Sequence, residues 1–412
     1  MISFDDAYNL TLDHIQPLPG EVVPLLLAEG RITDQDLLAK VDVPSLDVSL
    51  KDGYAILAAD NTTASAATPV SLKLAGSVAA GGQWQGTLSR GEAIRILSGA
   101  PLPGGADTVV AEEFTRSMRG SIQVVEFTEA GRNILRRGTD IRLGQLAVRT
   151  GHRLTPTVIG FLAAAGWQEI AVTRQPRVAI LATGDEVLAP GQPLVQGKLY
   201  ASNLFTLAAW CRHFGFPVQT YVLQDEEELI RRVLADCLEQ YDAVLTSGGA
   251  WKGEHDLVVK ILDELGWRKI YHQIRMGPGK AVGFGLFNKK PVFCLPGGPP
   301  SNHMAFLQLA LPGLQKLAGY PHPGFTQVPA ILTERITGQL DWTQFIHGRL
   351  EKENQHLIFH PLRIKSRLQE MAQTEAVARI PEGLEELPAN SPIMVQVLNS
   401  LLKLRYTIIK KI

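Results

Sequence analysis

Residues Val178-Ala-Ile-Leu-Ala-Thr-Gly-Asp-Glu186 decide the fold of this chain. The first five are apolar and Thr183 follows them, which predicts a strand buried on both faces, as in a parallel sheet. Gly184 predicts a tight turn that presents Asp185 and Glu186. Because ligands of open parallel sheets bind beyond the carboxyl ends of the strands, this turn is a candidate site. The alternative is an ordinary turn with a solvated acidic tip.

Two further apolar runs end in the same way. Ala243-Val-Leu-Thr-Ser-Gly-Gly249 is followed by Lys252-Gly-Glu-His-Asp256, and Leu295-Pro-Gly-Gly-Pro-Pro300 ends a predicted strand at 291–295. Backbone amides of such turns can hold phosphate or another oxyanion, and carboxylates can hold Mg²⁺. The repeated arrangement therefore predicts chemistry on a phosphorylated ligand.

Strands and helices alternate between residues 174 and 320. Predicted strands at 178–183, 217–223, 243–247 and 291–295 are followed by helices at 203–214, 226–240, 255–265 and 300–318. This alternation is typical of a doubly wound α/β domain.

The rest of the chain has a different character. Residues 1 to about 45 are predicted to be mainly helical, and residues 1–47 are expected to form a discontinuous domain with 140–173. Short β-like runs between 48 and 139 predict a small β insertion, and similar runs in 325–412 predict a C-terminal β domain after a Pro- and Gly-rich linker at 319–324.

Composition limits the classes of function. A chain of 412 residues is expected to form two to four domains, and 45% hydrophobic with 20% charged residues is typical of a soluble globular protein. The 40 basic and 41 acidic residues nearly cancel, so we expect neither nucleic acid nor membrane as a partner. Cys211, Cys237 and Cys294 have neither disulfide-framework nor zinc-site spacing, and a cytoplasmic location with buried cysteines is expected.

Several candidate residues have structural alternatives. Asp225 and Asp256 each precede a predicted helix and could be caps, which is the favoured interpretation for Asp225. His255 is more typical of a surface or cap residue than of a ligand. Lys280 offers a cation on a Pro-Gly-Lys turn, and Asp52 lies in a turn that could be a polar hinge.

Taken together, these segments resemble the molybdopterin molybdenumtransferase family, which includes MoeA and the gephyrin E domain. The match extends from about residue 4 to 398. It rests on Asp52-Gly-Tyr-Ala55, Ser98-Gly-Ala-Pro-Leu-Pro103, Arg137-Gly-Thr-Asp-Ile141, Ala182-Thr-Gly-Asp-Glu186, Asp225, Gly248-Gly249 with Gly253 and Asp256, Pro278-Gly-Lys280, and Leu295-Pro-Gly297 with Pro299.

The resemblance implies an elongated homodimer of four domains, with the active site between the α/β domain of one subunit and the small β domain of the other. It implies Mg²⁺, molybdate and adenylated molybdopterin, insertion of molybdenum, and release of AMP. MogA-type adenylyltransferases and molybdoenzyme-maturation proteins are the partners it suggests. The roles it implies are metal binding by Asp185, Glu186 and Asp256; catalysis by Asp52, Asp140, Glu186 and Asp225; and substrate binding by Ser98, Thr183, Gly184, Ser247, Gly248, Gly249, Lys280, Pro296 and Pro299.

The chain departs from the family pattern mainly at anion-binding positions. Lys51, Trp251, Lys252, Gly277, Ala281, Gly298, His347 and Lys365-Ser366 stand where the family usually has other residues. Lys51, Arg275, Lys252 and His347 are candidates to restore positive charge. The alternative function is a catalytically weakened paralogue that binds a pterin, a nucleotide or a protein partner.

Overall fold

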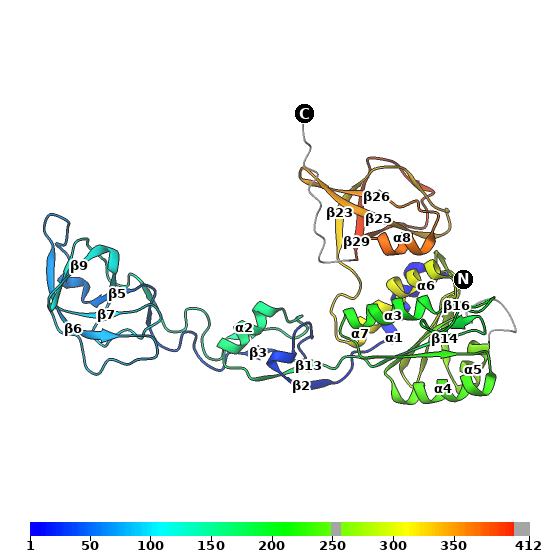
Figure 1. Ribbon diagram of the computed structural model, residues 1–412, viewed down its shortest axis with the longest axis horizontal. Coiled ribbons are helices and arrows are strands. Elements are labelled where there is room, and N and C mark those ends of the chain that lie inside the picture. Colours follow the sequence, from blue (N-terminus) through cyan, green and yellow to red (C-terminus); the bar gives the residue numbers. More distant parts are fainter. Residues whose placement is uncertain (249–256, 399–412) are drawn as a thin grey trace.

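A computed structural model describes residues 1–248 and 257–398. The molecule is elongated: a small β domain lies at one end, the α/β domain at the other, and a discontinuous domain lies between them (Figure 1). The C-terminal β domain sits beside the α/β domain. Among the described residues, no helix combines the length and apolar character that a membrane crossing requires.

The α/β domain is built on a six-stranded sheet in the order β17-β14-β18-β22-β21-β19. Strands β17 (Val218–Leu223), β14 (Val178–Thr183), β18 (Ala243–Ser247) and β22 (Lys290–Leu295) are parallel. Strands β21 (Gly283–Phe287) and β19 (Arg268–His272) continue the sheet in antiparallel pairing. The fold class predicted from the alternating pattern is thus confirmed.

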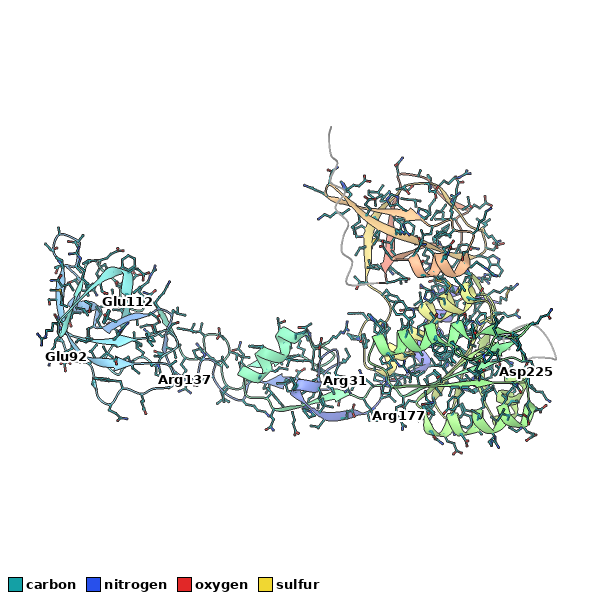
Figure 2. The ribbon with its side chains drawn as sticks, viewed as in Figure 1. Arg31, Glu92, Glu112, Arg137, Arg177 and Asp225 are labelled. Carbon is teal, nitrogen blue, oxygen red and sulfur yellow. The ribbon has the colours of Figure 1, made fainter. Side chains whose placement is uncertain are left out.

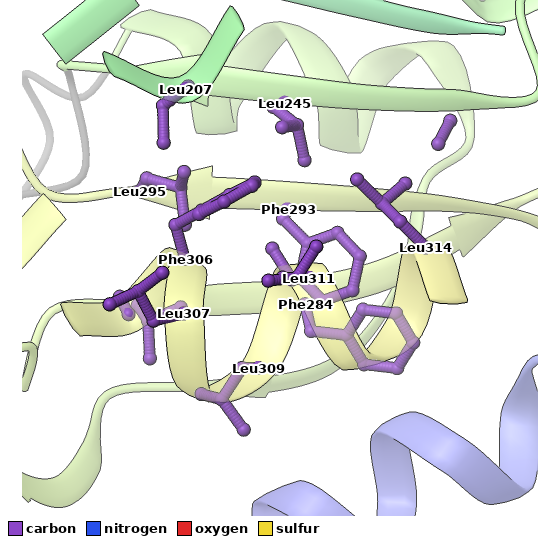
Figure 3. Close-up of a cluster of buried hydrophobic side chains, with 14 of the residues drawn as sticks. Leu207, Leu245, Phe284, Phe293, Leu295, Phe306, Leu307, Leu309, Leu311 and Leu314 are labelled. Atoms are coloured by element: carbon purple, nitrogen blue, oxygen red, sulfur yellow. The ribbon is translucent and has the colours of Figure 1, made fainter. Parts of the chain in front are cut away.

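Helices cover both faces of this sheet. One face packs against α3 (Ser202–His213), α6 (Pro299–Ala305), a π-helical turn (Phe306–Ala310) and α7 (Leu311–Leu317), and Figure 3 shows this cluster around Phe293 and Phe306. The other face packs against α4 (Glu227–Gln240) and α5 (Leu257–Leu265). Along β14, Ile180 belongs to the first core and Leu181 to the second. This is why the strand is apolar without alternation.

The prediction that residues 1–45 are mainly helical was wrong. Helix α1 spans Phe4–His14 and starts at Ser3, whose side chain caps the Asp6 N–H, but β2 (Gly20–Pro24), a single 3₁₀ turn (Leu25–Leu27) and β3 (Leu37–Leu38) follow it. The three leucines at 25–27 suggested a helix, but they form the 3₁₀ turn. Residues 1–47 were expected to form one domain with 140–173. Phe4 and Ala7 instead belong to the α/β core, so helix α1 packs with the α/β domain.

Segments far apart in sequence form the middle of the molecule. Strand β2 pairs with β13 (Glu169–Thr173), and β3 pairs with β12 (Leu146–Val148). Helix α2 (Pro156–Ala164) covers these strands and buries Leu162 in the same cluster as Ile170.

The small β domain holds a six-stranded sheet in the order β8-β5-β7-β6-β10-β9. Its strands are β5 (Gly53–Ile56), β6 (Val70–Val78), β7 (Glu92–Ile96), β8 (Thr108–Ala111), β9 (Thr115–Met118) and β10 (Ser121–Val124).

The C-terminal sheet extends into the α/β domain. Its order is β1-β20-β25-β26-β23-β29-β27, with β25 also paired to β27. The strands are β1 (Ile2–Ser3), β20 (Ile274–Gly277), β23 (Gln327–Leu332), β25 (Thr343–Glu353), β26 (His356–Pro361), β27 (Ala376–Ile380) and β29 (Pro392–Val397); helix α8 spans Arg367–Gln373. Because β20 pairs with β25, backbone hydrogen bonds join the two domains.

Candidate active site

Three of the predicted glycine turns meet at one edge of the parallel sheet. The Gly248 N–H donates to the Leu295 carbonyl at 3.3 Å, and the Gly184 N–H donates to the Leu223 carbonyl at 3.2 Å. A Cβ atom added to Gly297 would lie 3.8 Å from the Gly248 Cα. The parallel register of β14, β18 and β22 brings these strand ends together, as the sequence predicted.

Position 248 requires glycine for two reasons, its backbone conformation and the closeness of its neighbours. Its φ is +106°, which L side chains rarely adopt, and a Cβ atom there would lie 2.6 Å from the Thr183 carbonyl oxygen. The close approach lets the ends of β14 and β18 form a continuous wall.

A cleft of about 170 Å³ opens at this edge. The structure brings together five predicted residues in its lining: Thr183, Glu186, Ser247, Gly248 and Pro299. Asn203 and Gly297 also line it, together with apolar residues of the 187–204 segment. The Pro296 carbonyl lies beside this wall and accepts a hydrogen bond from Asn302 Nδ2 at 2.8 Å.

Asn203 and Asn302 were missed by the sequence reasoning. Asn203 Nδ2 donates to the Gly297 carbonyl at 2.8 Å and faces Ser247 Oγ at 3.3 Å, while Asn302 Nδ2 faces the same Oγ at 3.0 Å. The one sequence signal was an asparagine in the first turn of each of two helices that follow the cleft-forming strands.

Carboxylates gather next to the cleft. The Asp225 N–H donates to Asp185 Oδ1 at 3.2 Å. Desolvation raises the pKa of the Asp225 carboxyl; the backbone N–H of Asp185, directed at this carboxylate, opposes the rise, and the negative charges of Asp185 and Glu186 add to it. A cation would relieve this repulsion, and carboxylates are ligands that Mg²⁺ accepts, but the oxygens of these three side chains do not all lie within 4.8 Å of one another.

The favoured interpretation of Asp225 as a helix cap was wrong. Helix α4 begins one residue later than predicted, with Glu226 at its N-cap and no side-chain capping bond. The backbone of Asp225 instead ties this loop to the Asp185 turn. Gly249 and Asp256, as well as Trp251, Lys252, Gly253 and His255, lie outside the described residues.

The second predicted group lies at the other end of the molecule. Asp52 Oδ1 accepts the Ser98 N–H at 2.7 Å, so these two predicted residues do meet. Figure 2 shows Glu112, whose N–H bonds to the Asp52 carbonyl, far from Asp225. Asp140 is exposed and lies three residues beyond Arg137, which Figure 2 shows where the small β and middle domains join. One chain therefore does not bring Asp52, Ser98 or Asp140 to the cleft.

Lys280 lies apart from the cleft lining. Its ammonium is 5.2 Å from the centre of the Trp342 ring of the C-terminal domain. Arg275 is also engaged, because it donates to Glu382 at 2.9 Å and to the Met1 carbonyl.

His347 does not restore positive charge. Burial lowers its pKa, although the neighbouring Glu370, 3.2 Å from Nδ1, partly opposes this. Burial also lowers the pKa of His303 to about 3, and its Nε2 accepts the Trp210 indole N–H at 3.0 Å. The two imidazoles face each other across the boundary between the α/β and C-terminal domains, with ring centres 6.3 Å apart.

The three cysteines are buried, as predicted. Burial raises the pKa of the Cys211 thiol to about 12, which disfavours the reactive thiolate.

The fold and the cleft together define a multidomain α/β protein with a candidate ligand site at the carboxyl ends of its parallel strands. Family models match in two parts: the MoeA N-terminal region (domain I and II) over residues 2–166, and a probable molybdopterin binding domain over 179–316.

Whole-chain relatives agree with these two matches. Molybdopterin molybdenumtransferase 2 of Mycobacterium tuberculosis is 31% identical over 379 residues, covering 90% of this chain and 94% of that protein. The molybdopterin molybdenumtransferase of Haemophilus influenzae is 32% identical over 349 residues, covering 83% and 85%. The crystal structure of the molybdopterin biosynthesis MoeA protein from Pyrococcus horikoshii OT3 matches with a TM-score of 0.81 at 28% identity, covering 96% of this chain and all of that one. This chain belongs to the molybdopterin molybdenumtransferase family, which confirms the predicted resemblance.

Proposed function

We propose that this protein inserts molybdenum from molybdate into adenylated molybdopterin, with Mg²⁺, and releases AMP. The observation that carries the proposal is the strand-end cleft with Thr183, Ser247 and Gly248 in its wall and the Asp185–Glu186–Asp225 carboxylates beside it. The names of the relatives support the transferase activity and the pterin substrate.

The residues of this chain suit distinct tasks. The Ser247 and Thr183 hydroxyls line the cleft and would orient the substrate, while Asp185 and Glu186 would hold Mg²⁺. When bound, Mg²⁺ supplies positive charge that neutralises the pyrophosphate oxygens. Asp225, whose N–H bonds to Asp185, lies beside this group and is the candidate general acid–base.

We propose further that a second copy completes the site. Asp52 and Ser98 meet in the small β domain, and Asp140 lies three residues beyond Arg137, near the join to the middle domain. Because these residues lie far from the cleft of their own chain, a second copy would have to present them. The predicted homodimer would do so, and an enzyme that adenylates molybdopterin would supply the substrate.

The test supplies the purified protein with adenylated molybdopterin, Mg²⁺ and molybdate, and measures AMP and molybdenum cofactor. We expect AMP release that requires Mg²⁺. Asp185→Asn should lower Mg²⁺-dependent turnover with little change in unfolding, because the side chain is exposed and an asparagine oxygen can still accept the Asp225 N–H. Glu228→Gln, an exposed carboxylate change on α4, is the matched control. Tight pterin binding without AMP release would instead support the weakened paralogue.

A further inference from the structure

The amide orientation of Asn203 is fixed by its partners. A backbone carbonyl only accepts hydrogen bonds, so the side-chain atom 2.8 Å from the Gly297 carbonyl must be Nδ2. The same nitrogen lies 3.3 Å from Ser247 Oγ. These two bonds use both amide hydrogens, and the carbonyl oxygen of Asn203 accepts from no residue in 1–248 or 257–398.

The amide orientation of Asn302, a buried residue, is fixed in the same way. It is 1% exposed, and its Nδ2 donates to the Pro296 carbonyl at 2.8 Å and to Ser247 Oγ at 3.0 Å. The Pro296 carbonyl again leaves no choice between the amide nitrogen and oxygen.

The two asparagines together decide where the Ser247 proton points. A hydroxyl oxygen has two lone pairs and one hydrogen, and both lone pairs of Ser247 Oγ face amide donors. Its O–H donates to no described residue, and Ser247, 5% exposed, lines the cleft. The Ser247 O–H and the Asn203 C=O are therefore both without a partner among the described residues, on two side chains that line the same cleft.

Building on the proposed function, we infer that the Ser247 hydroxyl and the Asn203 carbonyl recognise the edge of a heterocyclic ring that carries an N–H donor beside an acceptor. Asn302 is the positioning residue that orients Ser247. A phosphate or molybdate oxygen at this point would satisfy Ser247 but would face the Asn203 carbonyl oxygen, so the wall disfavours an oxyanion here.

Cleft size agrees with one ring system. Pockets for whole drug-sized ligands are about 300–1,000 Å³, and this cleft is about 170 Å³. Both the pyrimidinone of a pterin and the adenine of a nucleotide carry a neighbouring donor and acceptor. The two halves of the adenylated substrate are therefore the two sources of this chemistry, and binding experiments separate them.

The experiment measures the dissociation constants of neopterin, AMP and inorganic phosphate for the full-length protein by calorimetry. Ser247→Ala should weaken the ring that occupies the cleft by about 3- to 10-fold, as expected for one lost hydrogen bond, and should leave phosphate unaffected. Ser247→Thr keeps the hydroxyl and should restore affinity. Thr206→Val removes a hydroxyl one turn further along α3 and serves as the matched control.

A double-mutant cycle tests the role of Asn302. If it acts by orienting Ser247, Asn302→Ala should weaken binding in the wild type but add nothing to Ser247→Ala. Three results would overturn the inference. The wild type and Ser247→Ala could bind each ring with equal affinity, neither ring could bind, or Ser247→Ala could lose phosphate binding as much as ring binding. Ring binding that depends on Ser247, in a wild type that releases no AMP from adenylated molybdopterin, would refute the proposed reaction alone.

Discussion

Gly248→Ala tests how the cleft wall is held together. The substituted residue must keep a φ near +106°, which costs an L residue about 1–2 kcal/mol. Its Cβ atom would also lie 2.6 Å from the Thr183 carbonyl oxygen, and relieving such an overlap typically costs about 1–3 kcal/mol. We therefore expect the α/β domain to lose about 2–5 kcal/mol of stability.

Gly298→Ala is the matched control in the next turn of the same edge. Its φ is −67°, and an added Cβ atom would meet nothing within 4 Å. This change should be neutral or stabilise by up to about 1 kcal/mol, because alanine restricts the unfolded chain.

Hydrogen exchange followed by mass spectrometry is the suitable assay, since a multidomain chain need not unfold in one step. Peptides that cover β14 and β18 should exchange faster in Gly248→Ala, and AMP release should fall with them. Protection equal to that of the wild type in Gly248→Ala, or an equal loss in both variants, would refute the argument from close approach.

Two further predictions concern buried ionisable groups. Burial holds the folded pKa of His303 at about 3, below its ordinary 6.5, so its contribution to stability is complete above pH 6.5 and falls by up to about 1.4 kcal/mol per unit as the pH decreases toward 3. Urea unfolding between pH 7.5 and 5.5 should show a smaller decrease for His303→Gln than for the wild type; identical slopes would contradict this. Arg174→Ala should cost about 1–3 kcal/mol, because Arg174 forms a two-bond pair with the buried Asp242 carboxylate at 2.7 and 2.8 Å. Arg177→Ala, whose longer 3.3 Å bond comes from a more exposed side chain, should cost less in the same thermal unfolding measurement; the reverse order would argue against it.

The four parallel strands of the α/β domain were predictable because their signals are local, whereas the antiparallel strands β19 and β21 were not predicted. A strand buried on both faces is apolar throughout, so β14, β18 and β22 were recognised within a residue or two of their bounds. The glycine turns were recognised for the same reason. The leucines at 25–27 show the limit, since a short apolar run does not distinguish a helix from a 3₁₀ turn beside a strand.

The sequence by itself determined the family, the parallel sheet and the carboxylates at its edge, because these depend on residue type and on spacing along the chain. Only the tertiary structure decided that Asn203 and Asn302 converge on Ser247 from 44 and 55 positions away. The position of each asparagine in the first turn of a helix does not reveal this role, since the bonds form only when the two helices pack against the end of β18. The tertiary structure also placed the Asp52–Ser98 pair in the small β domain, far from the cleft, and this separation is the physical reason for proposing a second subunit.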